Sequence, residues 1–238
     1  MISIIVPTYN EEKNVEKCLR ALHNQTISRE KYEIIIVDGH SNDKTRMIAR
    51  RFADRVIMQK TRWIAGARND GAHAAKYDII ACTDADCIVN EHWLEEIIKS
   101  LGKENTISVF GPMIPPESTG AFYKWLFFFT NKCISNLNKI NINFIFTSSF
   151  AFKKQPFLEI GGFSDISILE DFEISFRLRK KGEIIFNKNM NVIYDLRRFK
   201  KYGISGIIRI VHFNMIKILL GFKPAENIRY SKQNYDDT

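Results

Sequence analysis

Two aspartates separated by one small residue, Asp84-Ala85-Asp86, follow a short apolar run and are the clearest candidates for chemistry in the chain. In an extended chain, side chains two positions apart point to the same side. Two adjacent carboxylates repel each other, and a divalent cation between them removes that repulsion. The spacing therefore predicts a Mg²⁺ or Mn²⁺ site, with a solvated acidic turn as the alternative.

Polar residues also follow two apolar runs near the N-terminus. Asp38 comes directly after residues 33–37 and can hydrogen-bond a ribose or a nucleobase, although a simple turn uses the same residue type. Thr8, Tyr9 and Glu11 follow residues 2–6 and offer a stacking ring with polar groups, or a capped turn. Both segments are therefore candidate nucleotide contacts.

Glu170 and Asp171 stand at the predicted beginning of a helix that stops at Gly182. Acidic residues in a first turn commonly cap a helix and complement its dipole. A carboxylate brought near the Asp84 and Asp86 pair could instead take a proton from an acceptor hydroxyl group.

These residues need a scaffold, and the first half of the chain alternates short β-branched runs with helical patterns. Each apolar run is followed by polar residues, and in a parallel sheet covered by helices on both faces the carboxyl ends of the strands form the ligand-binding edge. Asn10 is a candidate N-cap for the first helix. The expected strands cover residues 2–6, 33–37, 55–58, 78–82, 106–110 and 145–152, and the expected helices cover 12–23, 43–53, 62–76, 90–101 and a stretch beginning with 122–129.

Taken in order, these segments resemble the family-2 glycosyltransferases, nucleotide-diphospho-sugar transferases of the GT-A fold. The resemblance rests on segments 7–11, 37–45, 67–71, 83–86, 161–163 and 169–171. It implies an α/β fold of the GT-A type, with a Rossmann-like, mostly parallel central sheet and helices on both faces. It also implies a glycosyltransferase domain over 1–196, with a nucleotide-binding half (1–110), an acceptor half (111–196) and a basic amphipathic segment at 197–238.

The resemblance also implies roles for single residues. Asp84 and Asp86 would face the donor and a divalent cation, either Mg²⁺ or Mn²⁺, and Asp171 would be the general base of an inverting transfer with Glu170 beside it. Arg197 and Arg198 could clamp a diphosphate, although the usual Gln and Trp of that segment are missing and a solvated basic turn explains them equally. The nucleotide-sugar contacts it implies are Pro7, Thr8, Tyr9, Glu11, Asp38, Arg68, Asp84, Arg197 and Arg198.

Composition fits one folded domain. The chain has 238 residues, of which 45% are hydrophobic and 26% charged, which excludes disordered and collagen-like classes. No signal-peptide pattern precedes the first strand. The four cysteines show no zinc spacing, so we expect reduced thiols in a cytoplasmic protein.

The C-terminal segment is strongly basic, with six of the eight net positive charges on residues 197–238. Residues 203–222 are long enough to span a bilayer, but Arg209, His212, Asn214 and Lys217 in their middle argue against a span. An amphipathic helix is expected, packed either on the domain or in the interface of an anionic membrane. The aromatic stretch 122–129 favours peripheral contact with the inner face of the cell membrane.

Three other functions fit parts of the sequence. A polyprenyl-phosphate glycosyltransferase needs no base, because its acceptor is already an anion. A nucleotidyltransferase usually has a Gly-rich basic loop after the first strand, which Pro7-Thr8-Tyr9-Asn10-Glu11 is not. A non-enzymatic protein could bind nucleic acid through its basic tail, but carboxylates at three strand ends would repel phosphate. We therefore expect a donor nucleotide-sugar and a hydroxyl acceptor, which the sequence allows to be lipid-linked, and no nucleic acid.

Overall fold

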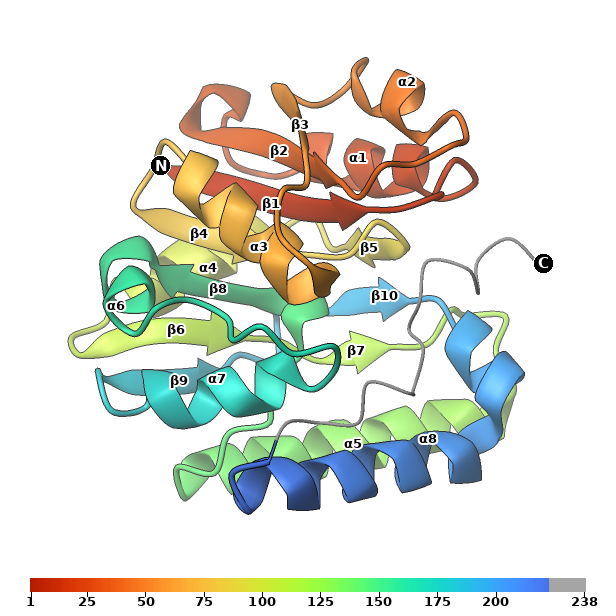
Figure 1. Ribbon diagram of the computed structural model, residues 1–238, viewed down its shortest axis with the longest axis vertical. Coiled ribbons are helices and arrows are strands. Elements are labelled where there is room, and N and C mark those ends of the chain that lie inside the picture. Colours follow the sequence, from red (N-terminus) through yellow and green to blue (C-terminus); the bar gives the residue numbers. More distant parts are fainter. Residues whose placement is uncertain (223–238) are drawn as a thin grey trace.

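A seven-stranded mixed sheet runs through the protein, with the strand order β3-β2-β1-β4-β8-β6-β9 (Figure 1). The computed structural model describes residues 1–222, apart from the side chains of Arg198, Lys200, Ile207, Ile208, Ile210 and Leu219. The strands are β1 (Ile2–Thr8), β2 (Tyr32–Asp38), β3 (Arg55–Met58), β4 (Ile79–Cys82), β6 (Thr106–Phe110), β8 (Phe150–Lys153) and β9 (Glu183–Phe186).

The first four strands are parallel, so their carboxyl ends meet at one edge of the sheet. β1 lies between β2 and β4 and is buried along its whole length, as expected of an Ile- and Val-rich strand with helices on both faces. β8 runs antiparallel to β4 and β6, which makes the sheet mixed but still mostly parallel.

Helices cover both faces of the sheet, which confirms the expected fold class. The helices α1 (Val15–His23), α2 (Thr45–Ala49) and α4 (Trp93–Leu101) lie on one face, and their apolar sides pack into a core around β1 and β2. The opposite face is covered by α3 (Trp63–Ala74), α6 (Lys154–Glu159) and α7 (Glu170–Leu178), which contribute small residues and phenylalanines.

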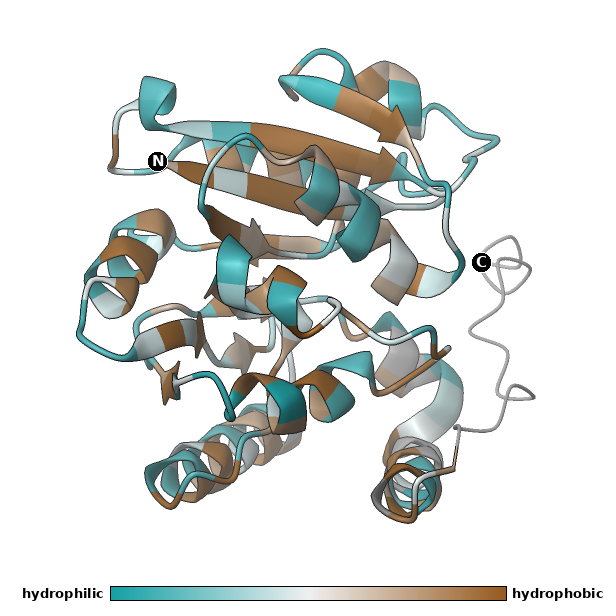
Figure 2. Ribbon diagram, turned by 60° about the vertical axis from the view of Figure 1, so that its left-hand side comes forward, coloured by the Kyte–Doolittle hydropathy of each residue, from teal (hydrophilic) through white to brown (hydrophobic). Residues whose placement is uncertain are grey.

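A smaller sheet and two long helices complete the fold. The smaller sheet has the order β5-β10-β7, formed by β5 (Cys87–Val89), β7 (Met113–Ile114) and β10 (Val192–Tyr194). Below it in Figure 1 lie α5 (Ala121–Lys139) and α8 (Arg197–Leu219), the latter kinked at Gly203. In Figure 2 these two helices stand apart at the foot of the molecule, and each contains both hydrophobic and hydrophilic residues. Within residues 1–222, no helix combines the length and apolar composition that crossing a bilayer requires.

Several boundaries predicted from the sequence are wrong. Asn10 has a φ of 52° and lies in a turn, so α1 begins later and Asn14 is its N-cap. The predicted strand 145–152 is shorter, because residues Thr147–Ser149 form a 3-10 turn (η2) before β8. The C-terminal helix starts at Arg197 rather than residue 203, and the last part of the predicted basic segment, residues 223–238, lies outside the described residues. Four short strands (β5, β7, β9 and β10) and the 3-10 turn η1 (Arg29–Lys31) are not predicted from the sequence.

Candidate active site

One large cavity, of about 1100 Å³, opens at the carboxyl ends of the parallel strands. Its walls come from the loops after β1, β2, β3 and β4, from the beginning of α7, and from α5 and α8. It brings together most of the site residues predicted from the sequence, although α7 lies far from β1 in the chain. The predicted residues that line it are Pro7, Thr8, Tyr9, Glu11, Arg68, Asp84, Asp86, Glu170 and Asp171.

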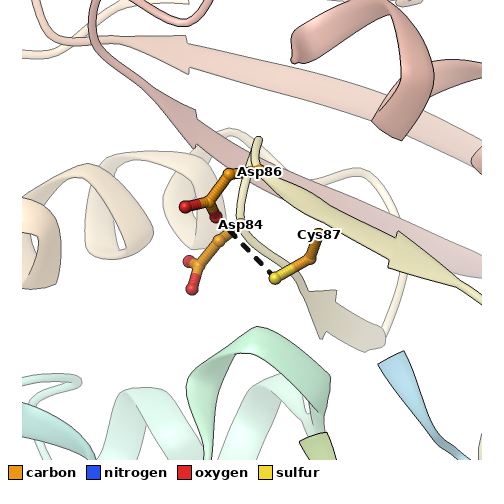
Figure 3. Close-up of side chains that lie close together, drawn as sticks. All are labelled: Asp84, Asp86 and Cys87. Carbon is orange, nitrogen blue, oxygen red and sulfur yellow. Dashed lines mark hydrogen bonds between the residues drawn. The ribbon is translucent and has the colours of Figure 1, made fainter. Parts of the chain in front are cut away.

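Asp84 and Asp86 lie side by side in the turn between β4 and β5 (Figure 3). Asp84, Asp86 and Cys87 each place a potential ligand atom within 4.8 Å of the others. The segment is not extended as the sequence suggested, because the Cys87 amide donates to the Asp84 carbonyl over 3.0 Å and closes a turn. The turn, rather than strand alternation, brings the two carboxylates together.

This pair fits a hard divalent cation. Carboxylate oxygens are the ligands that Mg²⁺ and Mn²⁺ prefer, and both side chains reach the cavity wall. Burial raises the pKa of Cys87 well above its usual value, and its thiol donates weakly to Asp86 Oδ1 over 3.8 Å. The candidate donor set is therefore the two carboxylates.

Arg68 joins the two sides of the cavity. Its Nη2 lies 2.8 Å from Asp84 Oδ1, and its Nη1 lies 2.7 Å from Glu170 Oε1. The side chain is only 1% exposed. Burial lowers the pKa of Arg68, but the negative charges of Asp84 and Glu170 raise this pKa by a larger amount. The guanidinium therefore stays charged. Arg68 thus fixes the position of the turn after β4 relative to the start of α7.

Arg197 makes the corresponding link from α8. Its Nη2 lies 2.9 Å from Asp86 Oδ2 and 3.0 Å from Glu11 Oε1, and its Nε lies 3.1 Å from Asp195 Oδ2. Burial raises the pKa of Glu11, and the nearby charge of Asp86 adds to the effect. The positive charge of Arg197 acts in the opposite direction and lowers the pKa of Glu11. Its predicted contact with a diphosphate stays a prediction.

Asp171 lies in the first turn of α7 and faces the same cavity. Leu169, with a φ of 58°, turns the chain sharply before the helix. The Phe172 amide donates to Asp171 Oδ1 over 2.8 Å. Burial, helped by the negative charge of Glu170, raises the pKa of Asp171 to about 7. A carboxylate of this kind can accept a proton near neutral pH, which suits a general base.

Asp38 has a different place from the one expected. It is fully buried at the end of β2, where its Oδ2 accepts hydrogen bonds from Thr8 Oγ1 (3.0 Å) and Ser41 Oγ (2.6 Å). Among the described residues it is the next two, Gly39 and His40, that reach the cavity wall. Asp38 therefore braces the loops after β1 and β2, and a direct contact with a nucleoside stays a prediction. The Arg198 side chain lies outside the described part of α8, so its predicted contact cannot be placed.

The loop after β3 also lines the cavity, and sequence reasoning missed it. Gln59 Nε2 donates to the carbonyl oxygens of Thr61 (2.7 Å) and Trp63 (2.6 Å), which fixes the loop, and Arg62 extends the same wall. The available signal was positional: this loop follows the carboxyl end of a parallel strand, where ligands bind in such sheets.

Comparison with known proteins gives a consistent picture. The family model described as Glycosyl transferase family 2 matches residues 3–161. Glycosyltransferase AglE of Haloferax volcanii is 36% identical over 106 residues, which cover 42% of this chain and 35% of AglE. The match thus spans about a third of the length of that relative.

Solved structures share the fold. A mannosyltransferase from Pyrobaculum calidifontis, in complex with GDP-Man and Mn²⁺, superposes with a TM-score of 0.76 at 22% identity, covering 94% of this chain and 65% of that one. TarS of S. aureus, residues 1–349 in complex with UDP-GlcNAc, gives a TM-score of 0.66 at 18% identity, covering 82% of this chain and 58% of that one. At these identities the likeness establishes the fold.

Proposed function

The chain belongs to glycosyl transferase family 2, and from that premise we propose that it moves a sugar from a nucleotide-diphospho-sugar to a hydroxyl group of an acceptor, with inversion at the anomeric carbon. One observation carries the proposal. The Asp84 and Asp86 pair and the candidate base Asp171 line the same cavity, on walls that Arg68 holds together. Direct displacement needs this arrangement, with leaving-group stabilisation on one side and proton acceptance on the other.

The donor side would be built by residues 1–110. Pro7, Thr8, Tyr9 and Glu11 would hold the nucleoside, with Arg68 near the diphosphate. A divalent cation held by Asp84 and Asp86 would neutralise the charge that develops on the departing diphosphate. The Pyrobaculum structure contains GDP-Man with Mn²⁺ and the TarS structure contains UDP-GlcNAc, which supports a nucleotide-sugar and a metal ion here without selecting the base or the sugar.

The acceptor side would be built by residues 111–196. Asp171 takes the proton of the acceptor hydroxyl, and that oxygen forms a bond to the anomeric carbon from the face opposite the diphosphate. The bond between the anomeric carbon and the β-phosphate oxygen breaks, and its electron pair leaves with the nucleoside diphosphate. Glu170 and Arg68 hold the start of α7 so that Asp171 stays at this position.

The acceptor we propose is part of a lipid-linked glycan, reached at the inner face of the cell membrane. The sequences of α5 and α8 support membrane contact, since they contain three and six Lys or Arg residues and no Asp or Glu. Their exposed hydrophobic side chains include Trp125 and Phe128 on α5 and Phe213 on α8. Cations and aromatic rings on one surface are typical of helices that lie on anionic bilayers.

Calorimetric titration with UDP and with GDP, in Mn²⁺ and in EDTA, tests the donor site. We expect one nucleotide to bind only with metal, and the Asp84→Asn/Asp86→Asn variant to lose that binding. The control is Asp165→Asn, because Asp165 is exposed and outside the cavity lining. If both nucleotides fail to bind the wild-type protein in either condition, the proposed activity is wrong.

A polyprenyl-phosphate acceptor remains a second candidate, because apolar side chains line the cavity beyond Asp171. An acceptor phosphate is already an anion and needs no base. Asp171→Asn distinguishes the two: it would abolish transfer to a hydroxyl group and leave transfer to a phosphate almost unchanged.

A further inference from the structure

The cavity continues past the carboxylates into a region lined by hydrophobic side chains from three elements. We call this region the apolar arm; it is formed by Leu126 and Phe127 of α5, Phe144, Phe172 of α7, and Val211 and Met215 of α8. A cavity for one drug-sized ligand measures roughly 300–1,000 Å³. The whole cavity, at about 1100 Å³, lies above that range, and the apolar arm is only one part of it.

The apolar arm begins directly beside the candidate base. Phe172 follows Asp171 in the chain, and its ring stacks on Phe144 with a centroid distance of 5.3 Å. An acceptor whose hydroxyl group reaches Asp171 can therefore place an apolar part against these rings. Binding an apolar ligand against hydrophobic side chains is favourable because it removes apolar surface from water. Binding a hydrated sugar there brings no such gain.

The two long helices form opposite walls of the arm and are joined at one end. Phe199, in the first turn of α8, packs on Phe127 of α5 with ring centroids 5.4 Å apart. After the kink at Gly203, α8 presents Val211 and Met215 to the cavity. Figure 2 shows α5 and α8 standing apart at the foot of the molecule, and both helices contribute side chains to the cavity lining. Leu126, Val211 and Met215 remain half-exposed on this inner surface.

We propose that the apolar arm between α5 and α8 binds the alkyl or isoprenoid chain of a lipid-linked acceptor. The proposal rests on the proposed function, because the donor site defines which end of the acceptor reacts. Two observations select a lipid chain: the arm is continuous with the reacting carboxylates, and both flanking helices are basic and free of acids. A chain whose head group is anionic suits helices that carry cations and no acids, and the outer faces of the same helices would meet the bilayer that supplies it.

The inner and outer faces can be tested separately. The inner variant is Leu126→Gln/Met215→Gln, which makes the arm polar. The matched outer variant is Phe128→Gln/Ile216→Gln, on the same two helices, whose side chains are 66% and 54% exposed. The probes are methyl, hexyl and dodecyl phosphate below their micellar concentrations, which share one head group and differ only in chain length. Binding is followed by calorimetry, and thermal melting of each variant checks that it folds.

We expect dodecyl phosphate to bind the wild-type protein at least roughly tenfold more tightly than hexyl phosphate, since each added CH₂ group gains burial free energy. The inner variant should lose this dependence and the outer variant should keep it. Equal affinities for the three phosphates in the wild-type protein, or equal losses in both variants, would overturn the proposal.

A second measurement on the wild-type protein does not depend on variants. A dodecyl phosphate with a diazirine at its chain end should label peptides from residues 121–139 and 204–218 on illumination. Labelling spread over the whole surface would contradict a defined arm. UDP and GDP titrations on the same samples test the proposed function separately from the lipid-chain site. If a nucleotide binds and the alkyl chain does not, the proposed donor site stands and only the proposal for the apolar arm is wrong.

Discussion

Arg197 Nη2, at the first residue of α8, lies 2.9 Å from Asp86 Oδ2 in the turn after β4. The same nitrogen lies 3.0 Å from Glu11 Oε1, so one cation joins α8 to the loops after β1 and β4. The helix that forms one wall of the apolar arm is therefore attached to a carboxylate of the candidate metal site. The proposed donor site and the placement of α8 therefore share this contact.

Arg197→Ala should strengthen the binding of Mn²⁺ alone and weaken the binding of nucleoside diphosphate. Removing the guanidinium takes a competing cation away from Asp86 and leaves Glu11 and Asp86 as neighbouring acids. It also removes the positive charge that we propose lies near the diphosphate. We expect changes of about 3-fold to 10-fold in each direction, because the site is partly open to solvent. Calorimetry with Mn²⁺, and with UDP or GDP, measures both.

The control is Arg179→Ala, since Arg179 is exposed at the end of α7 and contacts the Phe176 ring. It should leave both affinities unchanged. An Arg197→Ala protein that binds Mn²⁺ no more tightly than wild type would show that Arg197 does not compete for Asp86.

Arg68→Met should destabilise the fold more than any exposed arginine substitution. The variant leaves Asp84 and Glu170 without the buried cation that pairs with them. Breaking a buried ion pair from one side costs about 3–5 kcal/mol of unfolding free energy. Urea denaturation measures this loss. Arg68→Met/Glu170→Met should recover part of it, because the second change removes a buried unpaired charge; no recovery would mean that packing of the arginine stem dominates.

The fold, and the gathering of most candidate site residues around one cavity, were predictable from the sequence, since local patterns indicate the strands and the polar residues that follow them. Runs such as Ile34-Ile35-Ile36-Val37 are apolar on both faces, and that pattern indicates a buried parallel strand wherever it occurs. The position of Asp84 and Asp86 after such a strand places them at the ligand-binding edge without further information. The family resemblance added the order of the motifs.

The remaining features depend on contacts between distant residues, which no local pattern encodes. Arg197 pairs with Asp86 across 111 positions, and Arg68 pairs with Glu170 across 102 positions. Strands of two or three residues, such as β7 and β10, form through pairing with partners far away in the chain: β10 pairs with both β5 and β7. Asp38 shows the reverse case, because a side chain expected to face a ligand is buried and bonded to Thr8 and Ser41, with Arg46 Nε 3.7 Å from its Oδ1.

Gly111→Ala should destabilise the junction between β6 and β7. A Cβ atom at Gly111 would lie 1.9 Å from the carbonyl oxygen of Met190, which is backbone and cannot rotate away. Overpacking of this kind costs about 1–3 kcal/mol of unfolding free energy. Gly120→Ala is the matched control, because nothing lies within 4 Å of its Cβ position. Thermal melting of the two variants should separate them clearly, and equal melting temperatures would contradict the close approach to Met190.

The pH dependence of transfer should report Asp171. Its pKa is raised to about 7, first by burial and then by Glu170, so the side chain is protonated in mildly acidic solution and cannot accept a proton there. We expect kcat/KM to rise with pH and to level off above about 7, measured with saturating metal. Asp171→Asn should lower the rate by about 10²-fold to 10⁴-fold and remove the rising limb. A limb centred near pH 4 in the wild-type protein would exclude Asp171 as the base.

Stability should change in the opposite sense over the same pH range. An aspartate titrates near pH 3.9 in an unfolded chain, so between about pH 4 and 7 the folded protein holds a proton on Asp171 that the unfolded chain has released. The free energy of unfolding therefore falls as pH rises through this window. Asp171→Asn does not titrate and keeps an oxygen for the Phe172 amide. Its melting temperature should match wild type near pH 4 and exceed it at pH 8, whereas Asp165→Asn should show no such divergence. A single residue would then lower stability at the pH where the base is active, and parallel melting curves for Asp171→Asn and wild type would show that burial of Asp171 carries no such cost.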